Sequence, residues 1–282
     1  MWLWLIIGSA VLLGLYDVAK KHSLVKNDPL AILLVTTALT ALFLCPWLSA
    51  GTLKGHLYLV LKAVLVTVSW ISGMLALQKL PITIVSTFKA SRPVFVLIFS
   101  ILIYGERLNP WQWAGCVLAL VAIWMLSRSG KSEGIDFFHN RGVMYMVLAV
   151  AAGVASALWD KHIMKSLEPL FVQSWTNVYV SVLLALTIFI RHLLNPGLQV
   201  RFRWDWTLLL IAVLITGADF LYFFSLHSEG ALLSVVSMVR RSSVIITFVV
   251  GAVLFKEKNL RSKALDLVIM LAAMALIVIG SS

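Results

Sequence analysis

Ten long apolar runs follow one another along the chain, and only short polar segments connect them. The runs cover residues 2–19, 30–48, 57–77, 82–104, 111–127, 142–160, 170–190, 206–226, 231–255 and 262–280. A helix needs about 20 mostly apolar residues to cross the hydrocarbon core of a bilayer. Because lipid offers the backbone no hydrogen-bond partner, each run is expected to form a helix. The pattern therefore predicts an all-α membrane protein with ten transmembrane helices.

Composition excludes the other broad classes of protein. Of the 282 residues, 61% are hydrophobic and 12% are charged, whereas about 25% of a soluble domain is charged. Such a chain would expose too much apolar surface in water, and it is too hydrophobic to be disordered. Cys45 and Cys116 lie inside apolar runs, so neither indicates a disulfide framework or a metal site. We expect no cofactor, and the first run lacks the basic segment of a signal peptide.

The second half of the chain repeats motifs of the first half. Residues 16–24 and 159–167 each contain an aromatic residue, an aspartate, a basic segment and Ser-Leu. Residues 89–92 and 240–243 each place basic residues and serine ahead of an apolar run, which a charged segment with a glutamate follows. Two separate motifs therefore indicate an internal repeat.

This repeat divides the chain into a first five-helix unit at 1–130, a connecting loop at 131–141 and a second five-helix unit at 142–282. Because five is an odd number, the second unit is expected to be inverted relative to the first. Inverted repeats are typical of secondary transporters, whose substrate site lies near the midplane between the repeats.

Five of the 23 basic residues fall inside apolar runs, when Lys263, the second residue of the last run, is counted with the loop before it. Lys62 lies close enough to its helix end to extend to the interface. At 1.5 Å per residue, Lys89 and Arg92 lie about 12 and 16 Å into the fourth run, and Arg240 and Arg241 about 14–15 Å into the ninth. A charge at that depth costs at least about 2.5–3.5 kcal/mol. These four side chains are therefore expected to face the bundle interior or a wet cavity.

The deep cations suggest a binding site. Lys89 and Arg92 are three residues apart and share a helix face, whereas Arg240 and Arg241 point about 100° apart. If the repeats converge, these four residues and the neighbouring serines form a midplane anion site. The complete set of candidate binding residues is Lys89, Ser91, Arg92, Arg240, Arg241, Ser242, Trp70 and Tyr222, the last two being aromatic residues well inside their runs. Pro93 could kink the fourth helix beside Arg92.

The alternative is that buried carboxylates neutralise these cations. Asp219 lies in the middle of the eighth run, and Asp17 and Asp160 lie at the ends of the first and sixth. One mid-run acid cannot neutralise four bases, so a positive surplus is expected and the anion site is favoured. Asp219 is also a candidate for proton coupling, because a carboxylate in a low-dielectric site can bind a proton during transport.

The chain resembles the drug/metabolite transporter superfamily in its ten-helix EamA-type form. The resemblance rests on residues 76–78, Arg92-Pro93-Val94-Phe95, Gly105-Glu106-Arg107-Leu108 and the five-plus-five repeat. It implies an integral membrane transporter, placed in the bacterial inner membrane, and leaves the substrate open among amino acids, drugs, nucleotide-sugars and phosphorylated sugars. The second half departs from this pattern. It has Ser242-Ser243 near the position of Arg92-Pro93, and Lys256-Glu257-Lys258 in place of the Gly-Glu pair.

Within that superfamily, the arrangement is similar to the sugar-phosphate translocator branch. There, a lysine on the fourth helix and adjacent basic residues on the ninth hold the phosphate group. The resemblance implies the same role for Lys89, Arg240 and Arg241, and arginine suits phosphate or carboxylate because its guanidinium forms two parallel hydrogen bonds.

The favoured function is therefore secondary transport of a small organic anion by alternating access, with membrane lipid and no nucleic acid as partner. Export of amphipathic drugs or amino acids, and flipping of a phosphate-bearing lipid-linked substrate, remain alternatives. An enzyme acting on lipid phosphates is disfavoured, because the sequence contains no zinc signature, Gly-x-Ser-x-Gly elbow or P-loop.

Loop charge and family resemblance predict opposite orientations. Odd-numbered loops contain 14 basic residues and even-numbered loops contain four. The positive-inside rule then places the odd loops in the cytoplasm and both termini outside. The resemblance implies cytoplasmic termini instead.

Overall fold

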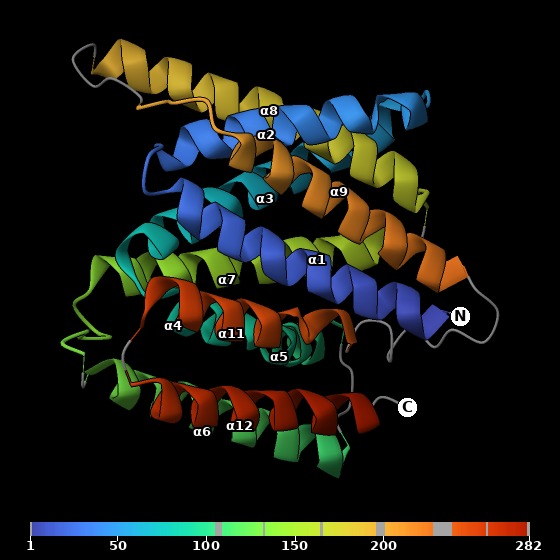
Figure 1. Cartoon of the computed structure of the whole chain (residues 1–282). Coiled ribbons are helices and arrows are strands. Elements are labelled where there is room, and N and C mark those ends of the chain that lie inside the picture. The colour runs from blue at the N-terminus through green and yellow to red at the C-terminus, as the bar shows by residue number, and fades with distance from the viewer. Residues whose placement is uncertain are drawn as a thin grey trace.

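The structure is a computed structural model that describes residues 2–104, 109–131, 133–163, 166–195, 201–227, 239–257 and 259–280. Within these ranges the chain is helical and contains no strand. The helices lie side by side in one bundle (Figure 1). The predicted all-α membrane fold is confirmed.

The first half forms α1 (Trp2–Ser23), α2 (Pro29–Phe43), α3 (Leu53–Lys79), α4 (Ile82–Ala90), α5 (Arg92–Tyr104) and α6 (Pro110–Lys131). The second half forms α7 (Arg141–Ile163), α8 (Pro169–Leu194), α9 (Trp206–His227), α11 (Ser243–Phe255) and α12 (Leu260–Ile279). Prolines begin several of these helices, since the first turn needs no N–H donor. Asp28 also caps α2 by accepting a hydrogen bond from the Leu30 N–H at 3.0 Å.

Among the described residues, six helices are long and apolar enough to cross a membrane: α1, α3, α6, α7, α8 and α12. The expected span at 30–48 is too long, because α2 ends at Phe43 and the short 3-10 helix Cys45–Trp47 follows. Pro46 explains this end, since it has no N–H to continue the helix. The expected span at 82–104 is split into α4 and α5. Residues 105–108, 231–238 and 258, which belong to predicted motifs or spans, lie outside the described residues.

The main helix contacts join one half of the chain to the other. Helix α1 packs against α9 and α3 against α7, so the first helix of each half meets the third helix of the other. Helix α2 packs against α8, α4 against α11 and α6 against α12. This reciprocal pairing is the pattern that two inverted repeats produce. In Figure 1, α1 begins and α12 ends at the same end of the bundle.

Glycines allow the closest of these contacts. A Cβ atom on Gly115 of α6 would lie 2.8 Å from the carbonyl oxygen of Ala273 on α12. A Cβ on Gly14 of α1 would lie 2.7 Å from the Cβ of Ile246 on α11. Small residues at such crossings let helix backbones approach within a bilayer, where dispersion contacts drive association.

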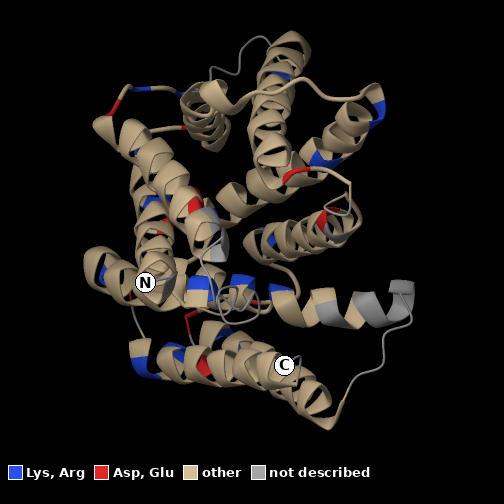
Figure 2. Cartoon of the chain, turned by 90° about the vertical axis from the view of Figure 1, so that its right-hand side faces the viewer, with Lys and Arg blue, Asp and Glu red and all other residues tan. Residues whose placement is uncertain are grey.

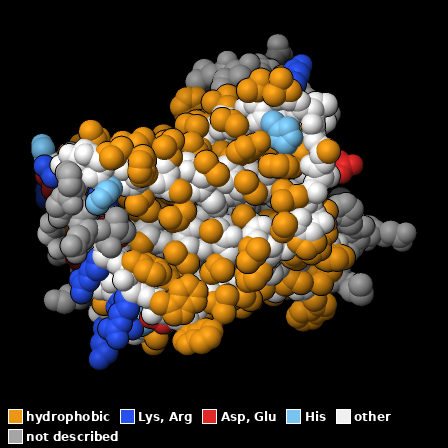
Figure 3. Space-filling view, turned by 90° about the horizontal axis from the view of Figure 1, so that it is seen from above, with side chains coloured by type: hydrophobic (Ala, Val, Ile, Leu, Met, Phe, Trp, Pro, Cys, Tyr) orange, Lys and Arg blue, Asp and Glu red, His pale blue; other side chains and the backbone are white. Residues whose placement is uncertain are grey.

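The outer surface is apolar and the charges are concentrated elsewhere. Seen from above, hydrophobic side chains are spread over the surface, and most of the visible Lys and Arg side chains lie at one end (Figure 3). Figure 2 shows charged residues on helices in the middle of the bundle as well as on outer segments. This distribution is the one expected of a chain surrounded by lipid, with polar groups kept to the ends and the interior.

Glu257 joins the two halves by capping α4. The residue before α4 is Pro81, which has no side chain able to cap it. Glu257 instead accepts hydrogen bonds from the N–H groups of Ile82 at 2.6 Å and Thr83 at 3.3 Å, and from the Thr83 hydroxyl. Lys263 is fully buried, and its Nζ lies 3.6 Å from the Glu257 Oε2 and 2.9 Å from the Glu133 Oε1. The charged segment after the ninth run therefore stabilises the helix that carries Lys89.

Replacing Glu257 by glutamine should lower the thermal unfolding midpoint of the detergent-purified protein. The variant loses charge-assisted bonds to the α4 N-terminus and weakens the pairing of a buried lysine, which together amount to about 1–3 kcal/mol. Glu168→Gln is the matched control, because Glu168 precedes α8 without a side-chain capping bond. Equal midpoints for the two variants would contradict the capping role.

Candidate functional site

A cavity of about 600 Å³ lies between the two halves of the chain. Helices α1 to α5 contribute to its lining from the first half, and α7, α8, α9, residues 240–241 and α11 contribute from the second. Nine of the eleven residues singled out in the sequence line it: Asp17, Trp70, Lys89, Arg92, Asp160, Asp219, Tyr222, Arg240 and Arg241. The repeat therefore brings these residues together at its interface.

The other two, Ser91 and Ser242, are not among the residues that line the cavity. They break the two equivalent helices at equivalent points. The Ser91 hydroxyl and N–H both donate to the Phe88 carbonyl, at 2.6 and 3.1 Å. Ser242 makes the same two bonds to the Val239 carbonyl, also at 2.6 and 3.1 Å. These serines thus position the cations beside them.

The break does not depend on proline. Pro93 follows Ser91 in the first half, whereas Val244 occupies the corresponding place after Ser242. Both helices nevertheless end their first segment with a three-residue turn, because each serine bonds the carbonyl three residues before it. Pro93 lies in the first turn of α5, where a missing N–H costs little. The serine with these two bonds is therefore a feature that both breaks share, whereas the proline predicted to kink the fourth helix is present at only one of them.

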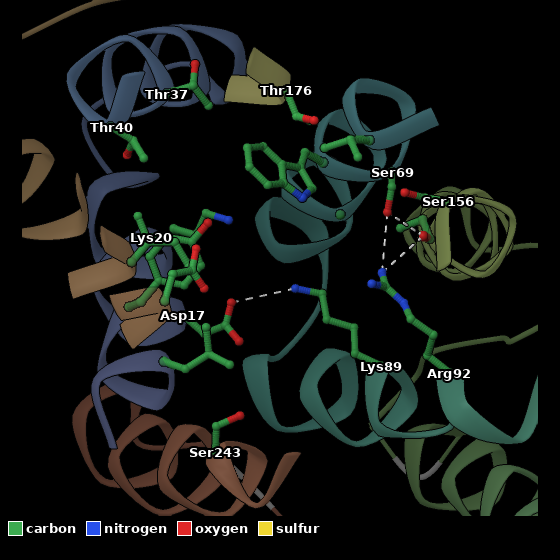
Figure 4. Close-up of a pocket in the computed structure, with 18 of the residues that line it drawn as sticks. Asp17, Lys20, Thr37, Thr40, Ser69, Lys89, Arg92, Ser156, Thr176 and Ser243 are labelled. Carbon is green, nitrogen blue, oxygen red and sulfur yellow. Dashed lines mark hydrogen bonds and ion pairs between the residues drawn. The ribbon is translucent and has the colours of Figure 1, made fainter. Parts of the chain in front are cut away.

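Three cations in the cavity have carboxylate partners. The Lys62 Nζ lies 2.6 Å from the Asp160 Oδ1, which links the two halves. The Lys89 Nζ lies 3.8 Å from the Asp17 Oδ1 (Figure 4). Arg240 pairs with Asp219 and lies over the Tyr222 ring, 4.2 Å from its centroid. Gln173 also donates to Asp219 at 2.8 Å. The expectation that Lys62 extends to the interface is wrong, because Asp160 draws it into the cavity.

Three further cations form no ion pair with a carboxylate among the described residues: Lys20, Arg92 and Arg241. Lys20 is 6% exposed, and its Nζ lies 4.2 Å from the centroid of the Tyr16 ring. Arg92 makes only long contacts, 3.4 Å to the Ser69 Oγ and 3.5 Å to the Ala149 carbonyl, and its Nε has no partner in the described part of the chain (Figure 4).

The cavity therefore carries surplus positive charge. Six basic side chains and three carboxylates line it, which leaves three cations uncompensated within the described lining. Carboxylates pair with half of these cations and leave the other half, so the positive surplus that the sequence predicted is present in the described lining. The first apolar run ends at residue 19, which predicts a loop position for Lys20, but α1 continues to Ser23. The position of Lys20 three residues after Asp17, on the same helix face, was the available signal.

Neutral polar side chains make up another part of the lining, which the sequence analysis did not predict. Helix α2 contributes Thr36, Thr37 and Thr40, and α8 contributes Gln173, Thr176 and Asn177. All except Gln173 are buried. The spacing of Thr36 and Thr40, one helical turn apart in an otherwise apolar run, is the pattern that could have revealed this surface.

The profile of the EamA-like transporter family matches residues 1–128 and 140–279. The chain belongs to the EamA-like transporter family. It is thus an integral multi-pass membrane protein of a family of small-molecule transporters. One crystal structure has a similar fold: the match covers 97% of this chain and 99% of the chain in that structure. The TM-score is 0.59 and the sequence identity is 14%, which supports the fold alone. No curated protein sequence matches the chain.

The ion pairs in this site predict that substitutions of the adjacent residues Arg240 and Arg241 affect stability differently. Arg240→Gln should lower the unfolding midpoint, because it leaves the Asp219 carboxylate without its cation, at a cost of about 1–3 kcal/mol for this partly exposed pair. Arg241→Gln should leave stability within about 0.5 kcal/mol of the original or raise it, because no described carboxylate loses a partner. Thermal unfolding in the same detergent compares the two, and an equal loss in both would contradict this assignment.

Proposed function

We propose that this chain is a secondary transporter that moves a small organic anion, a phosphorylated or carboxylated metabolite, by alternating access. The observation that carries the proposal is a group of three cations, in a cavity between the repeats, that no carboxylate of the described residues compensates. Each charge buried in a membrane protein interior costs at least about 2.5–3.5 kcal/mol unless something compensates it. An anionic ligand supplies that compensation, so its binding relieves a cost that the empty cavity retains.

The side chains also suit an anion in their chemistry. Arg92 and Arg241 offer planar guanidinium groups that bind phosphate or carboxylate oxygens in pairs, and Lys20 adds a point charge. A cationic drug would meet like charges in the same cavity. The surplus charge therefore favours anion transport over export of cationic amphipathic compounds, the alternative that the sequence left open.

The two ends of the bundle differ in a way that supports alternating access. The cavity extends to Thr40 in the last turn of α2 and to Pro169 at the start of α8. In Figure 1, both of these helix ends lie at the end of the bundle where α1 begins. The loops at the other end are joined by bonds between the two halves.

These bonds involve the segments that follow α1 and α8 and the last turn of α8. The Lys26 Nζ lies 3.2 Å from the Asp205 Oδ2, and the Arg191 Nη1 lies 3.4 Å from the Asp28 Oδ2. The Asp28 N–H also donates to the Arg201 carbonyl at 2.8 Å. Rocking of one half against the other, as alternating access requires, would break these bonds and open the cavity at this end.

The surplus charge also favours exchange of one anion for another. An empty cavity must change conformation with three cations uncompensated, whereas a loaded cavity changes conformation with its charge balanced. Asp219 is held by Arg240 and Gln173, so it serves first as a counter-ion within the site. Exchange therefore needs no proton at Asp219.

Anions should stabilise the purified protein through the unpaired arginines. A thermal-shift screen would compare inorganic phosphate, phosphorylated metabolites, carboxylates, amino acids and cationic dyes. We expect a shift of several degrees with one anionic class, which disappears in Arg241→Gln and persists in Arg128→Gln, an exposed arginine outside the cavity. An unchanged shift in Arg241→Gln, or stabilisation by cationic dyes only, would overturn the proposed function.

Gly153 provides a second test that leaves every charge in place. A Cβ atom at this position would collide with the Arg92 guanidinium, 2.7 Å from its Nε, whereas at Gly217 the nearest atom is the Leu12 Cδ1 at 3.3 Å. Gly153→Ala should displace the flexible Arg92 side chain and weaken anion binding about tenfold, while Gly217→Ala should leave it unchanged. The alanine also favours the helix, so the unfolding midpoint should not fall. Full affinity in Gly153→Ala would show that the position of Arg92 is unimportant for binding.

A further inference from the structure

The neutral polar lining of the cavity lies opposite its cationic part. Thr37 and Thr40 of α2 and Thr176 of α8 lie across the cavity from Lys89 and Arg92 (Figure 4). We call Thr36, Thr37, Thr40 and Thr176 the threonine wall. A ligand whose anionic group rests against the arginines would extend its remaining atoms toward this wall.

The hydrogen bonds of α2 leave the threonine wall rich in acceptors. The Thr37 hydroxyl donates to the Leu33 carbonyl at 2.7 Å, and the Thr40 hydroxyl donates to the Thr36 carbonyl at 2.9 Å. Thr36 donates likewise to the Ile32 carbonyl at 2.7 Å. Since each hydroxyl has one proton and two lone pairs, each of these oxygens keeps capacity to accept a hydrogen bond from a ligand.

Helix α8 adds to this capacity. The Thr176 Oγ1 is buried and has no hydrogen-bond partner among the described residues. The Asn177 amide donates to the Gln173 carbonyl, and the Gln173 amide donates to Asp219. The side-chain oxygens of both residues remain acceptors. A buried hydroxyl without a partner is unfavourable, so a ligand that bonds to Thr176 would relieve that cost.

The charges around the threonine wall select the kind of donor that fits it. The wall itself is neutral, and the three carboxylates in the described lining of the cavity, Asp17, Asp160 and Asp219, are already paired with Lys89, Lys62 and Arg240. An ammonium group there would find no free carboxylate and would be repelled by the surplus cations. Hydroxyl groups donate hydrogen bonds without adding charge. They can also accept the one hydrogen bond that the Thr176 hydroxyl donates.

We propose that the substrate is an anion that bears several hydroxyl groups, bound with its anionic group at Arg92 and Arg241 and its hydroxyls on the threonine wall. This inference rests on the proposed anion transport and adds the specificity of the same site. A volume of about 600 Å³ accommodates such a small metabolite together with water. Thr37, Thr40 and Thr176 are then the residues that determine specificity.

Two phosphates with the same carbon skeleton test this inference directly. Glycerol 1-phosphate and n-propyl phosphate differ by two hydroxyl groups, and 3-aminopropyl phosphate places an ammonium group on the same chain. Binding to the purified full-length protein is measured by calorimetry. We expect glycerol 1-phosphate to bind about tenfold more tightly than n-propyl phosphate, as two added hydrogen bonds would give. The ammonium compound should bind most weakly.

Valine substitutions then locate the effect. Thr37→Val with Thr40→Val should remove the preference for glycerol 1-phosphate and leave the affinity for n-propyl phosphate unchanged. Thr176→Val should reduce the preference for glycerol 1-phosphate over n-propyl phosphate by at least half. It should not lower stability, since the Thr176 hydroxyl makes no hydrogen bond to any described residue. Thr67→Val is the matched control, because Thr67 is also buried and without a partner in the described part of the chain but lies outside the cavity lining.

The outcomes separate this inference from the proposed function. Equal binding of the two phosphates, or a preference that survives in the valine variants, would overturn the threonine assignment while leaving the anion site in place. Tighter binding of 3-aminopropyl phosphate would also overturn it, in favour of a zwitterionic substrate. Failure of all three phosphates and of the matching carboxylates to bind would remove the anion site itself.

Discussion

In the described part of the chain, six basic side chains share one cavity with three carboxylates, while the outer surface of the protein faces lipid. This concentration of charge explains why the two halves pack as they do. A cation cannot face hydrocarbon without a cost of several kcal/mol, so the helices that carry Lys89, Arg92 and Arg240 must turn these residues toward each other. Lys62 and Asp160 come from different halves and pair at 2.6 Å, so each half completes the site of the other. The polar interior and the apolar exterior follow from the same constraint.

The internal repeat makes some positions of the site equivalent in the two halves, whereas other positions carry different residues. Ser91 and Ser242 break the two equivalent helices with the same pair of hydrogen bonds. Lys89 and Arg240 occupy equivalent positions, and each pairs with an aspartate. The next residues differ, because Arg92 corresponds to Ser243 and Ala90 to Arg241. The symmetric part builds the scaffold, and the asymmetric part sets the charge and shape of the site.

Sequence reasoning found more of the site's charges than of its neutral groups. Lys89, Arg92, Arg240 and Arg241 could be found because a charge inside a long apolar run needs an interior environment wherever the helix packs. Threonines give a weaker signal, because a hydroxyl in a membrane helix can bond to the carbonyl one turn back, so the spacing of Thr36 and Thr40 does not by itself indicate a ligand. Thr37 and Thr40 became notable only when the structure placed them opposite Arg92 (Figure 4).

The sequence by itself determined the helical class, the repeat and the residues that must avoid lipid, because these depend on run length, local hydrogen bonding and the cost of burying charge. Only the tertiary structure decided which cations are paired. Lys62 gained Asp160, Arg240 gained Asp219, and Lys20 entered the cavity because α1 continues to Ser23. Ion pairs form or fail over a few ångströms, and those distances arise from the packing of helices far apart in the chain.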